Sequence, residues 1–83
     1  MNTSSIPTPK EKEILNAIIQ YIEKYQYPPS IREIGDMVGL KSTSSVHHHL
    51  ENMNKKGLIE TEGFSIPRAI RVPGYRFVKE VST

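Results

Sequence analysis

Three helix-breaking features divide the first 57 residues into short segments, each with a helical spacing of apolar side chains. They are the Tyr-Pro-Pro sequence at 27–29, Gly39 and Gly57. Proline prevents a helix from continuing, and a glycine after a helical run supplies the left-handed residue that often ends one. The chain is therefore expected to bury its apolar surface by packing several short helices together.

The first segment begins at a capping box and carries an apolar stripe. Thr8 can cap a helix, and Glu11, three residues later, can reach back to the cap. We expect an amphipathic helix that ends near Gln26, because the prolines that follow cannot continue it. The residues before it, 1–7, are expected to be a flexible arm. Apolar side chains recur every four residues along the stripe, at Ile14, Ile18 and Ile22.

The second and third segments are joined by a very short link. Ser30 can cap the second helix, which should end at Gly39. Ser42 can cap the third helix, which should run to about Lys56. Only about three residues, 39–41, then separate the two helices. Two short helices joined by a tight turn that contains glycine are typical of a helix-turn-helix.

After the third helix the apolar spacing changes from helical to alternating. Residues 58–61 and 66–72 are predicted strands, joined by a turn at 62–65. The predicted fold class is therefore α+β, a three-helix winged helix-turn-helix over 8–73 whose wing is a small antiparallel β-hairpin. The last residues, 74–83, are expected to be a tail, a linker or an extra strand.

Composition narrows the possible functions. The chain has 83 residues, no cysteine and a net charge of +2, with a pI of about 9.0. Without cysteine it has no disulfide or thiolate metal site, which fits a cytoplasmic location. Neither a signal peptide nor an apolar run of about 20 residues that could span a bilayer is present. The mildly basic charge permits a nucleic-acid partner.

The sequence Val-His-His-His-Leu at 46–50 first suggests a metal or catalytic site. Metal-binding helices place ligands four residues apart so that both point at one ion, whereas adjacent histidines spread around the helix. Glu51 is a lone possible partner for them. Ser44 lies four residues before His48, but nothing obvious orients that imidazole as a base. We therefore expect no metal, no cofactor and no enzymatic activity.

Contact with DNA best explains the hydroxyl and imidazole side chains at the start of the third segment. In a helix-turn-helix, the N-terminal residues of the second helix of the motif meet base edges in the major groove. Small hydroxyl and imidazole side chains can donate or accept hydrogen bonds there. His49 is instead expected to seal the helix against the wing, and simple solvation is the alternative for the other two histidines. The residues expected to read bases are Ser42, Ser44, Ser45, His47 and His48.

Basic and hydroxyl side chains flank the same helix. Arg32 lies in the first turn of the second helix, where acidic residues are more usual. Arg71 lies on the second predicted wing strand, where ordinary solubility is an equal alternative. The residues expected to contact the phosphate backbone are Ser30, Arg32, Lys41, Thr43 and Arg68.

These motifs together resemble a known family. The sequence YPPSIREIGDMVGLKSTSSVHHHLENMNKKGLIE, followed by PRAIRV, is similar to the DNA-binding domain of the LexA repressors from about Thr8 to Val72. The resemblance implies a winged helix whose third helix reads a palindromic operator in the SOS response to DNA damage. It places the same five base-reading residues on the operator, and Ser65 beside Arg32 and Arg68 on its backbone. A homodimer on DNA is implied where a dimerisation domain or tail contact is present.

One departure from the family concerns length. LexA repressors carry a C-terminal domain that dimerises and cleaves itself at an Ala-Gly bond, and this chain has no Ala-Gly dipeptide. We expect either the DNA-binding part of a longer repressor or a free-standing LexA-like regulator. A rival hypothesis is a winged helix used for protein contact, without an SOS function. That use requires exposed aromatic or aliphatic anchors on the third helix, where this sequence has hydroxyls and imidazoles.

Overall fold

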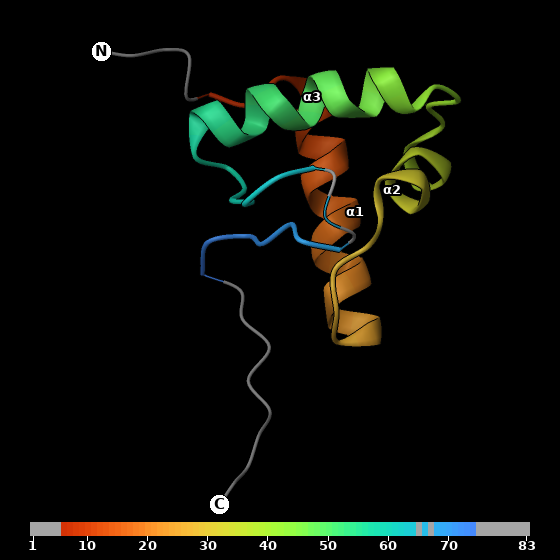
Figure 1. The fold of residues 1–83 in the computed structure, drawn as a ribbon, viewed down its shortest axis with the longest axis vertical. Helices are drawn as coiled ribbons and strands as arrows, with labels where there is room; N and C mark the ends of the chain where they lie inside the picture. Colours follow the sequence, from red (N-terminus) through yellow and green to blue (C-terminus); the bar gives the residue numbers. More distant parts are fainter. Residues whose placement is uncertain (1–5, 65, 67, 75–83) are drawn as a thin grey trace, which may run out of the picture.

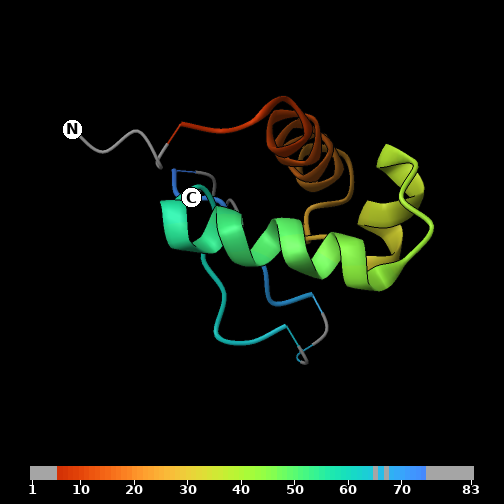
Figure 2. The ribbon, with the colours of Figure 1, turned by 90° about the horizontal axis from the view of Figure 1, so that it is seen from above.

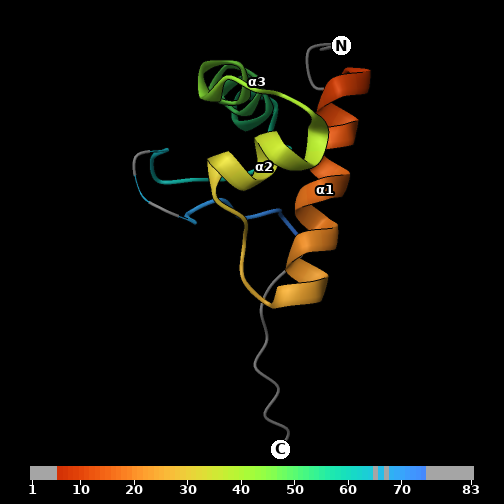
Figure 3. The same cartoon turned by 90° about the vertical axis from the view of Figure 1, so that its right-hand side faces the viewer.

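The computed structural model describes residues 6–64, 66 and 68–74. Its three helices are α1 (Pro9–Tyr25), α2 (Ile31–Val38) and α3 (Thr43–Lys56). Figure 1 shows α3 crossing the N-terminal half of α1, with α2 beside the start of α3. Figure 3 shows that α2 and α3 lie on the same side of α1, so the longest helix supports the other two.

The helix boundaries follow the local capping signals, as predicted. Thr8 accepts a hydrogen bond from the Glu11 N–H at 3.1 Å, and its own N–H donates to the Glu11 carboxylate at 3.0 Å. Ser30 and Glu33 repeat this exchange at the start of α2, with distances of 3.1 and 2.8 Å. The first helix ends one residue early, because Gln26 takes the left-handed conformation with φ 67°.

The turn between α2 and α3 is tight because two glycines allow it. Gly39 ends α2 with φ 75°, and the Leu40 N–H then donates to the Gly35 carbonyl at 2.9 Å. A Cβ on Gly35 would lie 2.8 Å from the Leu40 carbonyl oxygen and 3.2 Å from Cγ2 of Val46. Gly35 is therefore a position where α2 has no room for a side chain beside the turn and α3.

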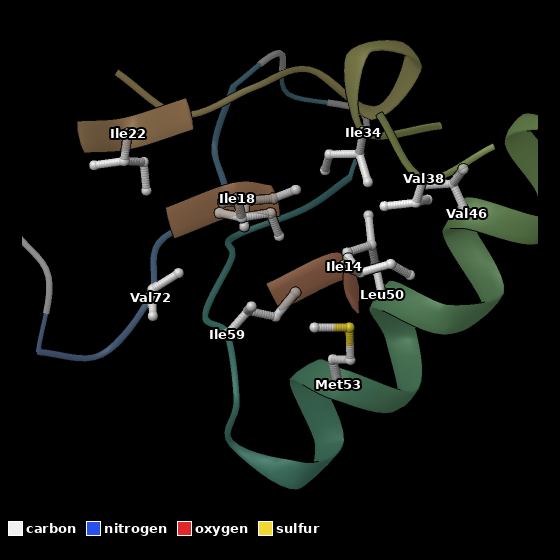
Figure 4. Close-up of a cluster of buried hydrophobic side chains, with 11 residues drawn as sticks. Ile14, Ile18, Ile22, Ile34, Val38, Val46, Leu50, Met53, Ile59 and Val72 are labelled. Carbon is white, nitrogen blue, oxygen red and sulfur yellow. The ribbon is translucent and has the colours of Figure 1, made fainter. Parts of the chain in front are cut away.

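The core is formed by all three helices and the segment that follows them. The apolar stripe of α1 packs in one core with two side chains from α2 and three from α3 (Figure 4). Residues beyond Gly57 complete the core, so this segment belongs to the same folding unit. The buried apolar side chains among the described residues are Ile14, Ile18, Ile22, Ile34, Val38, Val46, Leu50, Met53, Ile59, Ile70 and Val72.

The wing, residues 58–72, is a loop that returns on itself with little strand pairing. Figure 2 shows its cyan and blue segments projecting from α3 on the side away from α1. Glu60 and Arg71 form an antiparallel bridge in which each N–H donates to the other's carbonyl at 2.8 Å. In the described part of the wing this is the one pairing, so the predicted strands and β-hairpin are not confirmed. Locally, the Thr61 hydroxyl accepts from the Gly63 N–H at 3.1 Å and tightens the turn.

The two terminal predictions lie mostly outside the described residues. Residues 1–5 and 75–83 are not among them, so the flexible arm and the tail stay predictions. The end of the arm is placed: the Ile6 carbonyl accepts a hydrogen bond of 3.1 Å from the Lys56 ammonium. The chain thus enters α1 beside the C-terminal end of α3.

Candidate nucleic-acid interface

The N-terminal turn of α3 is exposed and carries no acidic side chain. Ser42 caps it by accepting a hydrogen bond from the Ser44 N–H at 3.1 Å. The unpaired N–H groups of a first helical turn carry partial positive charge and favour anions. This end of α3 can therefore approach a phosphate backbone without electrostatic repulsion.

Several of the predicted base-reading residues share one shallow depression on α3. Its lining includes Ser44, His47 and His48, with Thr43 at one end and Glu51 at the other. Ser44 and His48 are exposed and His47 is half-buried. Ser44, His47 and His48 thus border the same depression, while their role in reading bases stays a prediction.

The remaining two predicted base-reading residues lie at the edge of this group. Ser42 is exposed, but its hydroxyl oxygen is already used in the cap of α3. Ser45 is exposed and does not line the depression. Both stay predictions as base-reading residues.

Glu51 is a candidate that sequence reasoning left out of the site. It lies four residues after His47 and three after His48, so it shares their face of the helix. A carboxylate can accept a hydrogen bond from the N4 amino group of cytosine in the major groove. The spacing of Glu51 from the two histidines was the feature of the sequence that could have identified it as part of this face.

The histidine that lies against the wing differs from the one expected. The His47 ring lies against Phe64 of the wing, with ring centroids 5.2 Å apart, so the prediction that His49 seals α3 against the wing is wrong. His49 lies near enough to Glu11, in the first turn of α1, to affect its pKa. Burial alone would raise the pKa of Glu11 there, but hydrogen bonds from Lys56 and Thr8 outweigh it, with a smaller lowering contribution from His49.

Two of the predicted phosphate-contacting cations border the turn between α2 and α3. Arg32 and Lys41 line a common hollow with Thr43 and the carboxylate of Asp36. Within residues 6–64, 66 and 68–74 neither cation forms an ion pair. Ser30 is half-buried at the opposite end of α2, with its hydroxyl in the cap.

Arg68 is exposed, and its side chain is paired with groups of the domain itself. Its guanidinium forms an ion pair with Glu33 at 2.9 Å and donates to the Pro28 carbonyl at 2.8 Å. The hydrogen bond from Arg68, together with that from the Ser30 N–H, lowers the pKa of Glu33 to about 2. Ser65 lies outside the described residues, so its predicted contact with the backbone is not tested.

The described residues also bear on two other possible functions, metal binding and membrane insertion. No three His, Cys, Asp or Glu side chains among them are grouped in a way that could hold a metal ion. None of the three helices combines the length and apolar character needed to cross a bilayer.

The second and third helices, their tight glycine turn and the exposed polar start of α3 define the class of helix-turn-helix domains. Comparison with known proteins gives the family. The family model described as the LexA DNA binding domain matches residues 5–69. The chain belongs to this family.

Individual relatives agree with the family match. A LexA repressor of Acetivibrio thermocellus is 51% identical over 63 residues, which are 76% of this chain and 29% of the relative. One from Clostridium botulinum is 47% identical over 81 residues, or 98% of this chain and 39% of the relative. One from Carboxydothermus hydrogenoformans is 40% identical over 78 residues, or 94% and 38%. The chain therefore spans well under half the length of these relatives.

Proposed function

We propose that this domain binds double-stranded DNA in a sequence-specific way, as the operator-reading part of a LexA-type transcriptional repressor. The start of α3 enters the major groove, and the side chains on its exposed face read base edges. The observation that carries the proposal is the convergence of Ser44, His47 and His48 on one solvent-facing depression at the helix start. The domain itself has no enzymatic role in this scheme.

The roles of individual side chains follow from their exposure. His48 is the most direct reader, because it is exposed and one turn beyond Ser44. An imidazole N–H can donate to the N7 or O6 of guanine, and a serine hydroxyl can donate or accept. His47 assists from the flank, since its ring also packs on Phe64. Ser42 and Ser45 read at the margins of the same face.

Phosphate contacts come from the region around the turn between the two helices. Arg32, Lys41 and Thr43 border one hollow there, beside the exposed start of α3. The N-cap hydroxyl of Ser30 and the wing residue Ser65 are further backbone contacts that family resemblance supports. Such contacts set the register of the protein on the duplex and carry little sequence information.

The relatives are LexA repressors, which supports a role for this domain in repression. We infer that it regulates genes of the SOS response to DNA damage in the cytoplasm, on a palindromic operator. Two copies bind the two half-sites when a dimerisation domain or a tail contact joins them. Joining the copies raises the affinity through effective concentration, without any new base contact.

A protein-docking role for α3 is the competing function, and the exposed apolar side chains argue against it. The large apolar side chains that are exposed in the described residues lie outside α3: they are Ile6, Tyr25, Tyr27, Met37 and Ile66. Without an aromatic or aliphatic anchor, the exposed face of α3 lacks the feature that dominates protein–protein binding.

Selection of bound sequences from a random duplex pool tests the proposed function. We expect enrichment of one short motif, recovered as a single half-site if the domain acts as a monomer. A Ser44→Ala, His48→Ala double variant should lose preference at the base pairs that those side chains contact. Recovery of an unenriched pool by the parent domain would refute sequence-specific binding.

A further inference from the structure

The guanidinium of Arg68 joins three segments that are far apart in the sequence. Nη2 donates to Oε2 of Glu33 at 3.0 Å, and Nη1 lies 2.9 Å from Oε1 of the same carboxylate. Nη1 also donates to the Pro28 carbonyl at 2.8 Å and to the Tyr21 hydroxyl at 3.3 Å. The wing is thereby fastened to the end of α1, the turn after it and the first turn of α2.

Two aromatic rings also lie close to the same guanidinium. Its central carbon lies 4.8 Å from the centroid of the Tyr27 ring and 6.0 Å from that of Tyr21. Cations at these distances are attracted by the face of an aromatic ring. Arg68 also has φ 56°, a left-handed conformation that is costly for a residue with a side chain. The surrounding contacts maintain this conformation at the start of the returning wing segment.

The partner carboxylate has a second structural role. Oε1 of Glu33 accepts a hydrogen bond of 2.8 Å from the Ser30 N–H, which closes the capping box of α2. A single carboxylate therefore fixes both the start of the helix-turn-helix and the wing. Arg71, three residues after Arg68, pairs with Glu60 across the wing. Holding Arg68 in place therefore also constrains where the two sides of the wing meet.

We propose that Arg68 is a positioning residue for DNA recognition: its ion pair and hydrogen bond with Glu33 hold the wing beside α3, and it does not itself contact phosphate. This inference rests on the proposed DNA-binding function and replaces the phosphate contact expected from the sequence. Nη1 and Nη2 already donate within the domain, and the adjacent Glu33 carboxylate would repel a phosphate. Arg32 and Lys41 then remain as the side-chain cations for the backbone.

Glu33→Gln is the variant that separates positioning from phosphate contact. Glutamine retains the carbonyl oxygen that a capping box requires, but it removes the charge that pairs with Arg68. If Arg68 positions the wing, Glu33→Gln should weaken binding to the selected duplex by about tenfold, the scale of one charge-assisted hydrogen bond. If Arg68 contacts phosphate, removing a nearby negative charge should leave binding unchanged or make it tighter.

The salt dependence of binding supplies the second readout, which a loss of stability alone would not change. Every variant is titrated well below its melting temperature. Arg68→Lys keeps the charge but loses the fork of donors. It should weaken binding as Glu33→Gln does, and the double variant should be no weaker than either single one. The slope of log K against log salt should match that of the parent in Arg68→Ala, whereas loss of a phosphate contact would make it shallower by about 0.9.

The outcomes distinguish this inference from the proposed function. A parent that shows no preference for any duplex refutes the proposed function. A parent that binds its selected site, with a Glu33→Gln variant that binds equally well, overturns the positioning role alone. If Glu33→Gln fails to fold, Arg68→Ala decides by its salt slope: a slope shallower by about 0.9 overturns the inference, and weaker binding with the slope of the parent supports it.

Discussion

Lys56, in the last turn of α3, donates a hydrogen bond of 2.6 Å to Glu11 in the first turn of α1. Glu11 is 2% exposed and is the one charged side chain that is fully buried among the described residues. The pair joins the end of the proposed recognition helix to the start of the helix that supports it. The orientation of α3 therefore depends on this contact at one end and on the glycine turn at the other.

Removing Lys56 should destabilise the domain, because it leaves a buried carboxylate without its charge partner. We expect Lys56→Met to lower the free energy of unfolding by about 3 kcal/mol, in the range found when one member of a buried ion pair is removed. The double variant Glu11→Gln, Lys56→Met should recover much of this loss, since glutamine keeps the capping box and carries no charge. Chemical denaturation of the three proteins measures both values. A Lys56→Met protein as stable as the parent would show that the pair has no structural importance.

The Gly35→Ala substitution should be destabilising although alanine is the better helix former. The added Cβ would lie 2.8 Å from the Leu40 carbonyl oxygen, a backbone atom that cannot move without opening the turn. We expect a loss of about 1–3 kcal/mol, the usual cost of overpacking. Met37→Ala, at an exposed position in the same helix, is the control and should stay within about 0.5 kcal/mol of the parent. A Gly35→Ala domain with a raised melting temperature would refute this account of the turn.

The Glu33 carboxylate should make part of the stability of the domain depend on pH in acid. Its pKa is lowered to about 2, so the native state favours its ionised form. That stabilisation is present above the ordinary pKa of about 4.5 and is lost as pH falls through about 2. The Glu33→Gln variant should therefore lose less stability than the parent between about pH 5 and pH 2.5. Equal losses, measured from denaturation midpoints, would contradict the lowered pKa.

Zinc should not stabilise the domain. His47 lies against the wing and His49 lies near Glu11 of α1, while the His48 and His49 ring centroids are 6.0 Å apart. The three histidines are adjacent in sequence and lack the four-residue spacing of helical ligands, and no group of three or more metal-binding side chains occurs in the described residues. We expect stoichiometric zinc to leave the melting temperature unchanged. A rise that a chelator reverses would show that the histidines form a site.

The helices were predictable from the sequence because the signals that define them are local. The capping boxes at Thr8 and Ser30 and the glycine at 39 act within four residues, and the structure confirms their positions. The apolar stripe of α1 is likewise set by its own spacing. Gly35 was missed, because its importance comes from the approach of Leu40 across the turn.

The wing and its contacts depend on partners that are distant in the sequence. Arg68 pairs with a carboxylate 35 residues earlier, so charge alone suggested a phosphate contact. A helical wheel gives His47 and His49 almost equivalent flanks, and only the path of the chain after α3 decides which one meets Phe64. The strands of the wing were inferred from alternation, whereas the described residues show an isolated bridge between Glu60 and Arg71 and no extended strand.

The most direct measurement is the affinity of His48→Ala for the selected duplex and for a scrambled duplex of the same composition. The account predicts a loss of about 1–3 kcal/mol on the selected duplex, the discrimination from one good side-chain contact to a base. It predicts little change on the scrambled duplex, because His48 is proposed to contact base edges and not the phosphate backbone. His49→Ala, on the other flank of α3, should retain the discrimination of the parent. Equal affinity of His48→Ala and the parent for both duplexes would contradict the claim that this face of α3 reads the sequence through His48.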